Sequence, residues 1–466
     1  MRKDWVEVEL REILLKLENG KRPLGGVSGI ADGVPSIGGE HLNSTGGFRF
    51  EKIKFVPKEF ADAMNKGFIE EEDILIVKDG ATTGKVSYVG KDFPFSYSVI
   101  NEHVFKCKLY SIFNKKFVFY FLFGITGQKR ILLNFKGSAQ GGINTTFADN
   151  TKIPIAPLPE QRAIVSKIEL LFSELDNAVS NLKQAKDKLE IFRQSVLKKA
   201  FEGELTKCVI TNLPLSKFAL LITKGSSPNW QGFDYISNQN ELLFITSENV
   251  REGYLSLKKK KYLSLEFNKK QSRSILQKGD VLFNLVGASI GRAAIFNLDK
   301  IGNINQAVSI IRLDKTLNNN YLNYFLNSGI AKNEYMKNVV EVARANLSLQ
   351  DVNCIEIPHC SILEQQEIVK EIETRFSVAD KLVESIEESL LKAEALRQSI
   401  LKKAFEGELL SKAELDVCRK KADWEPAGKL LERINANSGE SGTGILVQSG
   451  TKSLLQNLLK FKVYFS

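Results

Sequence analysis

The feature that most constrains this chain of 466 residues is an internal repeat. The segment from Glu160 to Leu205 recurs from Glu364 to Leu409 at a constant offset of 204 and without insertion. About half of the paired positions are identical, and both copies end in Leu-Lys-Lys-Ala-Phe-Glu-Gly-Glu-Leu. A repeat of this kind predicts two globular modules, each followed by the same element.

Each copy predicts one long helix with an apolar seam, because its apolar residues follow alternating steps of four and three, the spacing of heptad a and d positions. The seam of the first copy is Ile164, Ile168, Leu171, Leu175, Ala178, Leu182, Ala185, Leu189, Phe192 and Val196. That of the second is Ile368, Ile372, Ala379, Leu382, Ile386, Ala393, Leu396 and Ile400. Arg375 and Ser389 interrupt the second copy, so we expect a weaker seam there. Gly203 and Gly407 stand where a helix end favours a left-handed residue.

Three arrangements fit two such helices: an intramolecular pair that acts as a spacer, the core of a larger bundle, or a homodimerisation device. The matched ends favour the intramolecular pair, because a lone coiled coil needs no matched ends. A helix of about 40 residues is about 60 Å long.

Composition and charge restrict the class of protein. With 43% hydrophobic and 26% charged residues the chain is typical of a globular protein. The charged N-terminus and the five scattered cysteines predict a cytoplasmic chain with reduced thiols and no zinc site. The net charge of +10 lies on the modules: residues 1–157 have 22 Lys and Arg against 18 Asp and Glu, and residues 206–357 have 19 against 12. Two basic modules joined by neutral helices favour a polyanionic partner.

Both modules contain the pattern Asp-(Ile/Val)-Leu followed by Gly-Ala-x-x-Gly-(Lys/Arg), at 73–85 and at 280–292. It predicts a strand, a glycine turn and a second strand, with a cation at the turn. Only three residues separate the glycines and Val86 follows Lys85, so the pattern does not match a phosphate-binding loop. A purely structural role for these glycines is as good an interpretation as a DNA contact. In each module, β-rich stretches such as 93–109 are mixed with helical ones such as 114–123, without a repeating βαβ order, which predicts an α+β fold.

The residues of catalysis are missing from the sequence. There are three histidines, none at metal-ligand spacing from another, and no Gly-x-Ser-x-Gly elbow, S-adenosylmethionine loop or nuclease motif. A basic, duplicated chain of this kind is more typical of a reader of nucleic acid than of an enzyme.

The order of module, helix, related module and near-identical helix resembles the specificity subunits of type I restriction–modification systems. The resemblance rests on 158–161 (Leu-Pro-Glu-Gln) and 363–365 (Leu-Glu-Gln), on the paired endings at 197–205 and 401–409, and on 425–434. It implies an α+β fold with two target recognition domains and two long antiparallel coiled-coil helices related by a pseudo-twofold axis. The implied divisions are a first recognition domain (1–157), a first spacer helix (158–205), a second recognition domain (206–360), a second spacer helix (361–409), a conserved segment (410–434) and a tail of unknown role (435–466).

The resemblance also implies a function. Each domain would read one half of a bipartite DNA target, and the helices would fix the gap. Two methyltransferase subunits would methylate an adenine in each half-site, and two restriction subunits would cleave unmethylated DNA. S-adenosylmethionine, ATP and magnesium would then bind the partner subunits and not this chain.

Candidate DNA-binding residues follow from the chemistry of DNA contacts. Cations at turns would contact phosphates, and Asn, Thr and Arg near the module ends would read bases. The first set is Lys21, Arg22, Lys78, Lys85, Lys224, Arg292 and the run Lys258–Lys261; the second is Asn144, Thr145, Arg344 and Asn346.

Candidate residues for methyltransferase docking lie in the paired helix ends, because two identical surfaces suit two identical partners. They are Lys198, Lys199, Phe201 and Glu202 in the first copy and Lys402, Lys403, Phe405 and Glu406 in the second. Packing of the helices within the chain is an equally good explanation of the paired ends.

Two other functions remain open at this stage: the specificity half of a fused methyltransferase or endonuclease, and a scaffold whose modules bind protein. A DNA reader should lose affinity steeply as salt rises, whereas a protein scaffold need not.

Overall fold

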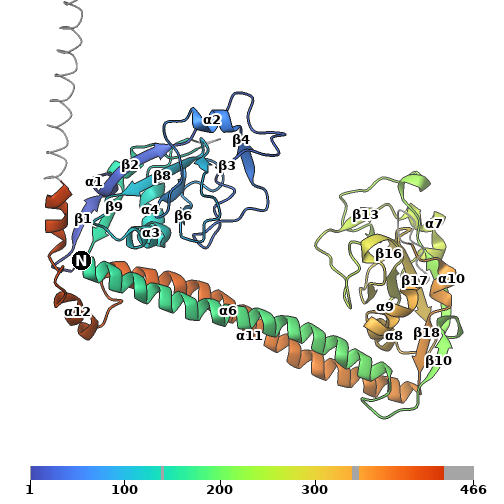
Figure 1. The fold of residues 1–466 in the computed structure, drawn as a ribbon. Helices are drawn as coiled ribbons and strands as arrows, with labels where there is room; N and C mark the ends of the chain where they lie inside the picture. The colour runs from blue at the N-terminus through green and yellow to red at the C-terminus, as the bar shows by residue number, and fades with distance from the viewer. Residues whose placement is uncertain (1, 138–140, 338–345, 435–466) are drawn as a thin grey trace, which may run out of the picture. The chain divides into compact units, whose positions relative to one another are not determined.

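The computed structural model describes residues 2–137, 141–337 and 346–434 (Figure 1). The chain divides into two compact units: the first comprises Met1–Ser180 and Leu390–Ser466, and the second comprises Asn181–Ser389. Each unit therefore contains one module, the beginning of one long helix and the end of the other. The predicted tail, 435–466, lies outside the described residues.

The module of the first unit contains three small sheets. A four-stranded sheet has the order β2-β8-β5-β6, a three-stranded sheet the order β4-β3-β7, and β1 pairs with β9. The strands are β1 (Val6–Glu9), β2 (Leu14–Asn19), β3 (Val34–Ile37), β4 (Lys54–Val56), β5 (Ile74–Val77), β6 (Val86–Tyr88), β7 (Val99–Ile100), β8 (Val104–Leu109) and β9 (Lys152–Ile155). The helices are α1 (Leu10–Ile13), α2 (Lys58–Asp62), α3 (Lys115–Phe123), α4 (Ile125–Leu132) and α5 (Phe147–Asn150).

The module of the second unit has the same sheets in the same order. They are β11-β17-β14-β15, β13-β12-β16 and the pair β10-β18. The strands are β10 (Thr211–Pro214), β11 (Ala219–Lys224), β12 (Leu242–Ile245), β13 (Lys261–Leu263), β14 (Val281–Asn284), β15 (Ala293–Ile295), β16 (Gly302–Ile304), β17 (Val308–Leu313) and β18 (Glu356–His359). The helices are α7 (Glu266–Lys270), α8 (Asn319–Leu326), α9 (Gly329–Met336) and α10 (Leu349–Asn353). The predicted α+β fold and internal repeat are confirmed.

The two long helices are α6 (Leu158–Phe201) and α11 (Ile362–Glu406). Both end at the predicted glycines, since Gly203 and Gly407 adopt φ of 79° and 80°. The amide of Glu204 donates to the carbonyl of Lys199, and that of Glu408 to Lys403, which satisfies carbonyls that the helix end leaves free.

Within each unit the end of one long helix lies beside the beginning of the other, so the two segments are antiparallel. In the first unit Arg397 pairs with Asp176, and its guanidinium lies 4.4 Å from the ring centre of Phe172. In the second unit Arg193 lies 2.5 Å from Asp380 and 4.9 Å from the ring centre of Phe376. All three positions are related by the offset of 204.

The predicted seam is wrong at Ala178, which is exposed, and at Phe192, Leu382 and Leu396, which are 41%, 49% and 52% exposed. At two of these turns the neighbouring arginine, Arg193 or Arg397, is turned inward. Its stem and planar head cover a phenylalanine while the carboxylate neutralises its charge. A pattern of apolar residues alone does not predict this arrangement.

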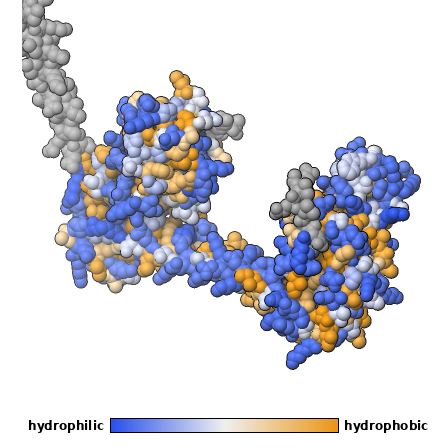
Figure 2. Space-filling view, turned by 45° about the vertical axis from the view of Figure 1, so that its right-hand side comes forward, coloured by the Kyte–Doolittle hydropathy of each residue, from blue (hydrophilic) through white to orange (hydrophobic). Residues whose placement is uncertain are grey.

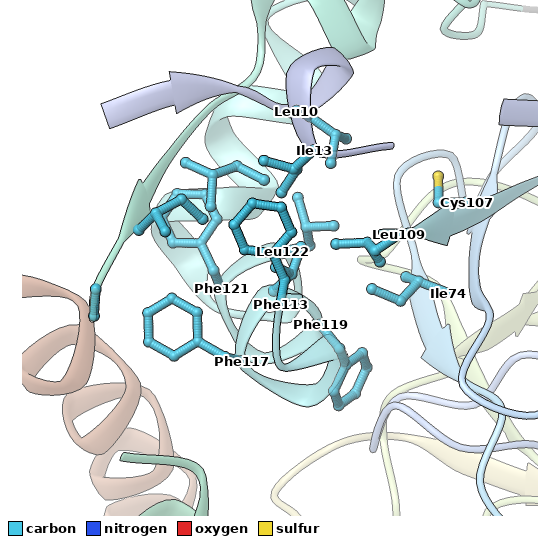
Figure 3. Packing of buried hydrophobic residues seen from close by; sticks show 14 of the residues in the cluster. Leu10, Ile13, Ile74, Cys107, Leu109, Phe113, Phe117, Phe119, Phe121 and Leu122 are labelled. Carbon is cyan, nitrogen blue, oxygen red and sulfur yellow. The ribbon is translucent and has the colours of Figure 1, made fainter. Parts of the chain in front are cut away.

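The ends of the long helices are locked into the modules by one phenylalanine each. Phe405 lies 5.0 Å from Phe117 and 5.2 Å from Phe121 of α3. Phe201 lies 5.1 Å from Tyr321 and 5.2 Å from Phe325 of α8. All four ring pairs are edge-on, an arrangement that aromatic pairs prefer. Figure 3 shows the aromatic side chains of α3 within the core that also contains Leu10, Ile13 and Leu109.

The beginnings of the long helices are locked by a buried glutamine. Gln161 accepts from the amide of Asn114 (3.0 Å) and donates to the carbonyl of Ala156 (2.7 Å). Gln365 makes the matching bonds to Asn318 (2.8 Å) and to the carbonyl of Cys360 (2.9 Å). The shared glutamine therefore fixes the start of each long helix against the N-terminus of α3 in the first unit and of α8 in the second.

The first unit also contains the segment 410–434, with helix α12 (Lys412–Arg419). The amide of Ala427 donates to the carbonyl of Asp4 at 3.1 Å. Lys167 of α6 lies 2.8 Å from Glu414, and this bond, with those from Ser411, lowers the pKa of Glu414 to about 2. The segment therefore completes the core of the unit that holds the N-terminus.

Candidate nucleic-acid interface

Four segments of the first module lie side by side at one end of its sheets. The amide of Lys78, which follows β5, donates to the carbonyl of His103 (2.8 Å), and the amide of Ile143 donates to that of Lys78 (2.8 Å). Gly20, which follows β2, leaves no room for a side chain, because an added Cβ would lie 1.9 Å from the carbonyl oxygen of Ile100. The end of β2, the end of β5, the connection from β7 to β8 and the segment 142–145 therefore meet.

A network of charges covers this end of the first module. His103 lies between two carboxylates: its Nδ1 is 2.5 Å from Asp79 and its Nε2 is 3.3 Å from Glu102. Arg22 lies 3.6 Å from Glu102 and Lys78 lies 3.7 Å from Asp79. We call these five residues the His103 network. It presents cationic hydrogen-bond donors and anionic acceptors on exposed or half-buried side chains, which suits contacts to phosphates and base edges.

The structure brings most of the predicted residues of the first module to this end. Arg22 and Lys78 belong to the network, and the exposed Lys21 precedes Arg22. Asn144 and Thr145 are also exposed and follow the segment bonded to Lys78. The side-chain oxygen of Asn144 accepts from the amide of Thr146 at 3.0 Å, so its amide nitrogen is the group that faces outward from the turn.

Lys85 is placed differently from the other predicted cations. Its Nζ donates to the carbonyl of Leu42 at 3.2 Å, and burial together with the charge of Arg49 lowers its pKa. Gly80 and Gly84, which flank the turn before it, adopt φ of 89° and 85°, a conformation that favours glycine. The predicted strand–turn–strand is present, and its glycines allow the positive φ angles that the turn requires.

The second module repeats the backbone of this end but not its charges. The amide of Leu285 donates to the carbonyl of Ala307, and that of Leu347 to Leu285, each at 2.9 Å. Gly225 packs on the carbonyl of Ile304 as Gly20 packs on Ile100. Val286 takes the position of Asp79, and Gln306 and Ala307 take those of Glu102 and His103.

The predicted residues of the second module are only partly assembled. Lys224 ends β11, directly before Gly225, and Asn346 forms a bridge with Val286; both are exposed. Arg292 follows the glycine turn and lies 4.0 Å from Glu252. In the run Lys258–Lys261 the first three are exposed, and Lys261 lies 5.2 Å from the ring centre of Tyr235. Arg344 lies outside the described residues.

The candidate docking residues divide into inward and outward side chains. Phe201 is buried and Phe405 is half-buried, each in the aromatic cluster of its own module. The alternative of packing within the chain therefore accounts for these two. Lys198, Lys199, Glu202, Lys402, Lys403 and Glu406 are all exposed, and the pairs Lys198–Glu202 and Lys402–Glu406 lie at 3.9 Å.

Sequence reasoning missed Asp79, Glu102 and His103. The available signal was the alignment of the two modules, in which these three positions change from charged to uncharged. Over the described ranges, no group of three or more His, Cys, Asp or Glu could hold a metal ion. No helix among the residues that the structure describes is both long and apolar enough to cross a membrane.

Comparison with known proteins decides the family. The family model described as type I restriction modification DNA specificity domain matches residues 2–190 and 227–392, one copy for each module. The chain belongs to the family of type I specificity subunits. Its members are the subunits that recognise DNA in type I restriction enzymes and are not catalytic, so the prediction of a non-catalytic reader is confirmed.

Individual relatives of this specificity subunit cover nearly its whole length. The EcoBI specificity subunit of Escherichia coli is 28% identical, over 89% of this chain and 91% of its own. The EcoKI specificity subunit of E. coli strain K12 is 27% identical, over 88% and 90%. A chain from a structure of a type I restriction–modification system has a TM-score of 0.66 at 19% identity and covers 88% of this chain and 99% of its own. The HsdS subunit of Thermoanaerobacter tengcongensis has a TM-score of 0.51, also at 19% identity.

Proposed function

We propose that this chain reads a bipartite DNA target and directs adenine methylation and ATP-dependent cleavage by partner subunits. Each module reads one half-site, and the paired helices set the gap between them. The observation that carries the proposal is the duplicated packing: both modules attach to the long helices through the same contacts at an offset of 204. Two equivalent readers on one chain suit a target with two halves.

The loops that differ between the modules support two different half-sites. The His103 network presents a histidine, two carboxylates and two cations, whereas the matching positions of the second module are uncharged. Carboxylates accept from cytosine and adenine amino groups, and arginine donates to guanine, so these sets select different bases. The second module carries the larger basic surplus and relies on Lys224 and its other cations for phosphate contacts.

The partners in this proposal are two methyltransferase subunits and two restriction subunits. The exposed side chains of the matched helix ends, such as Lys199 and Lys403, are the proposed methyltransferase contacts. S-adenosylmethionine, ATP and magnesium bind those partners, which supply the chemistry. The work takes place in the cytoplasm, where DNA is accessible.

The test is to map adenine methylation in DNA from cells that express this chain with its methyltransferase partner. We expect methylation at one two-part motif with a fixed gap, absent from cells that lack this chain. Methylation that is unchanged without the chain would contradict the proposal, and so would binding to DNA that is insensitive to salt.

The role of the helices has its own test. Insertion of one heptad into both α6 and α11 keeps the seam in register and adds about 10 Å, or about three base pairs. The mapped gap should grow by that amount while both half-sites stay the same. Insertion into α6 alone is the matched control and should abolish methylation, since it takes the pair out of register.

A further inference from the structure

Both modules present an apolar side chain at the tip of the loop that follows the edge strand of the four-stranded sheet. In the first module the loop runs Gly20-Lys21-Arg22-Pro23-Leu24, and Leu24 is 105% exposed. In the second it runs Gly225-Ser226-Ser227-Pro228-Asn229-Trp230, and Trp230 is 78% exposed. Hydrophobic side chains form scattered patches on the face shown in Figure 2, and few are as exposed as these two.

The two loops begin at equivalent places. Gly20 and Gly225 each pack so tightly that an added Cβ would lie 1.9 Å from a carbonyl oxygen, of Ile100 in one module and of Ile304 in the other. A proline follows three residues later in both. The loops therefore leave the sheets in the same way and project beside the segments that carry the candidate DNA contacts.

Hydrogen bonds organise the loop of the second module next to Trp230. The amide of Gln231 donates to the carbonyl of Pro228 (2.9 Å), as does that of Phe233 (3.0 Å). Lys270 donates to the carbonyl of Gln231 at 2.9 Å and lies over the ring of Phe233. A fixed turn that presents a tryptophan to solvent is organised for contact rather than for packing within the module.

Cations lie in or beside both loops. Leu24 follows Lys21 and Arg22, of which Arg22 also reaches Glu102 in the His103 network. The loop of Trp230 begins one residue after Lys224 and is held by Lys270. An exposed apolar side chain on a loop that also carries or adjoins cations fits the groove of DNA, where cations contact phosphates while an apolar side chain touches or wedges between bases.

We propose that Trp230 and Leu24 are the apolar base contacts of the two recognition domains, each inserted against a base step of its own half-site. This inference rests on the proposed function and deepens it, because it names side chains that the candidate residues do not include. Trp230, with its large aromatic face, makes the stronger contact, and Leu24 the weaker one.

The test uses the complex of this chain with its methyltransferase partner and duplexes that contain the mapped motif. Trp230→Ala should weaken binding about 10- to 100-fold, the loss that follows removal of one base–aromatic stack. The loss should vanish on a duplex whose second half-site is scrambled. Trp230→Phe should retain most of the affinity, and Leu24→Ala should show a smaller loss that depends on the first half-site.

Fluorescence gives an independent measurement. The chain has three tryptophans, of which Trp5 is buried and Trp424 is half-buried. The difference in emission between wild type and Trp230→Phe therefore isolates Trp230 and should be quenched by the matching duplex. Val209→Ala, which removes another exposed apolar side chain of the same unit, is the control for general effects.

Three results would overturn the inference while the proposed function stands. In the first, Trp230→Ala binds the wild-type motif as tightly as Val209→Ala does, with no quenching. In the second, Trp230→Ala weakens every duplex equally, which indicates a non-specific contact. In the third, the variant loses the methyltransferase partner in gel filtration, which assigns the loop to a protein contact. A wild-type complex that binds no split motif would instead contradict the proposed function itself.

Discussion

The two units share one backbone plan but differ in how they present chemistry at the candidate DNA-binding end. The sheet orders, the buried glutamines and the arginine–phenylalanine pairs match position by position. In contrast, the His103 network has no charged counterpart, and the loop after the edge strand exposes a leucine in one module and a tryptophan, one position further along, in the other. The comparison teaches that attachment to the helices and reading of DNA are separate properties, carried by separate residues.

The largest expected effect tests the matched attachments. Phe201→Ala removes a buried ring from an aromatic cluster and should lower the free energy of unfolding of the second unit by about 3–4 kcal/mol. Phe405→Ala should cost the first unit less, because Phe405 is only half-buried. Hydrogen exchange followed by mass spectrometry reports the two units separately. Equal losses in both units from either variant would contradict the assignment of one ring to each unit.

A second difference concerns the buried aspartate of the shared Asp-(Ile/Val)-Leu pattern. Burial raises the pKa of Asp73 to about 6, whereas Asp280 is held by two bonds from Arg312 of 2.7 and 2.8 Å. In the folded first unit the carboxyl group of Asp73 stays protonated at a pH where it has lost its proton in the unfolded chain. Its stability should therefore fall as pH rises from about 4 to about 6, by at most about 3 kcal/mol.

Asp73→Asn should remove this pH dependence, because asparagine does not titrate in this range. Lys106 keeps Glu18 as a partner at 3.0 Å, so the substitution does not leave that lysine unpaired. Asp280→Asn should instead destabilise the second unit at neutral pH, because it weakens the partner of Arg312. Denaturation of both variants between pH 4 and 7 provides the check. A slope that persists in Asp73→Asn would assign the pH dependence to another group.

A third prediction addresses DNA reading. His103→Gln removes the imidazole that contacts both Asp79 and Glu102. The preference for the first half-site over altered sequences should fall by about 10-fold, which corresponds to one lost specific contact. The second half-site should be unaffected. Gln306→Ala, at the position that matches Glu102, is the converse variant and should act on the second half-site alone. Competition binding with duplexes altered in one half measures both, and equal relaxation of both halves would sink the assignment.

The smallest expected effect tests the repeated arginine contacts. Arg193→Lys and Arg397→Lys keep the charge but lose the planar stacking on Phe376 and Phe172. Each should cost its own unit about 1 kcal/mol. Thermal unfolding measures the loss, with Lys186→Arg, on the exposed pair with Glu387, as a control that should change little. Unequal losses would show that the matching geometry hides different energetics.

Much of the scaffold could be predicted because its rules are periodic. The repeat gave the duplicated helices, and Gly203 and Gly407 ended them in the predicted conformation. The pattern failed where an arginine covers an apolar ring, as Arg193 and Arg397 do, so Phe192 and Leu396 were wrongly assigned to the seam. The division between domains at 157–158 and 360–361 stays a prediction.

The candidate site was less predictable because it assembles from distant loops. Lys78, His103 and Ile143 meet only through backbone hydrogen bonds across the ends of strands, and no spacing in the sequence reveals that. Trp230 gave no signal at all, since exposure of a single side chain depends on the turn that carries it. The roles of the exposed lysines at the helix ends also remain predictions.

The most direct test of the account replaces the second module, residues 206–360, with a copy of residues 1–157. Methylation mapped in cells that carry this chimera and the methyltransferase partner should show a two-part motif in which the first half-site occurs twice, in inverted orientation, with a fixed gap. That result follows if the modules are equivalent readers on equivalent attachments. Methylation that still requires the original second half-site would contradict the account, because the reading of DNA would then lie outside the modules.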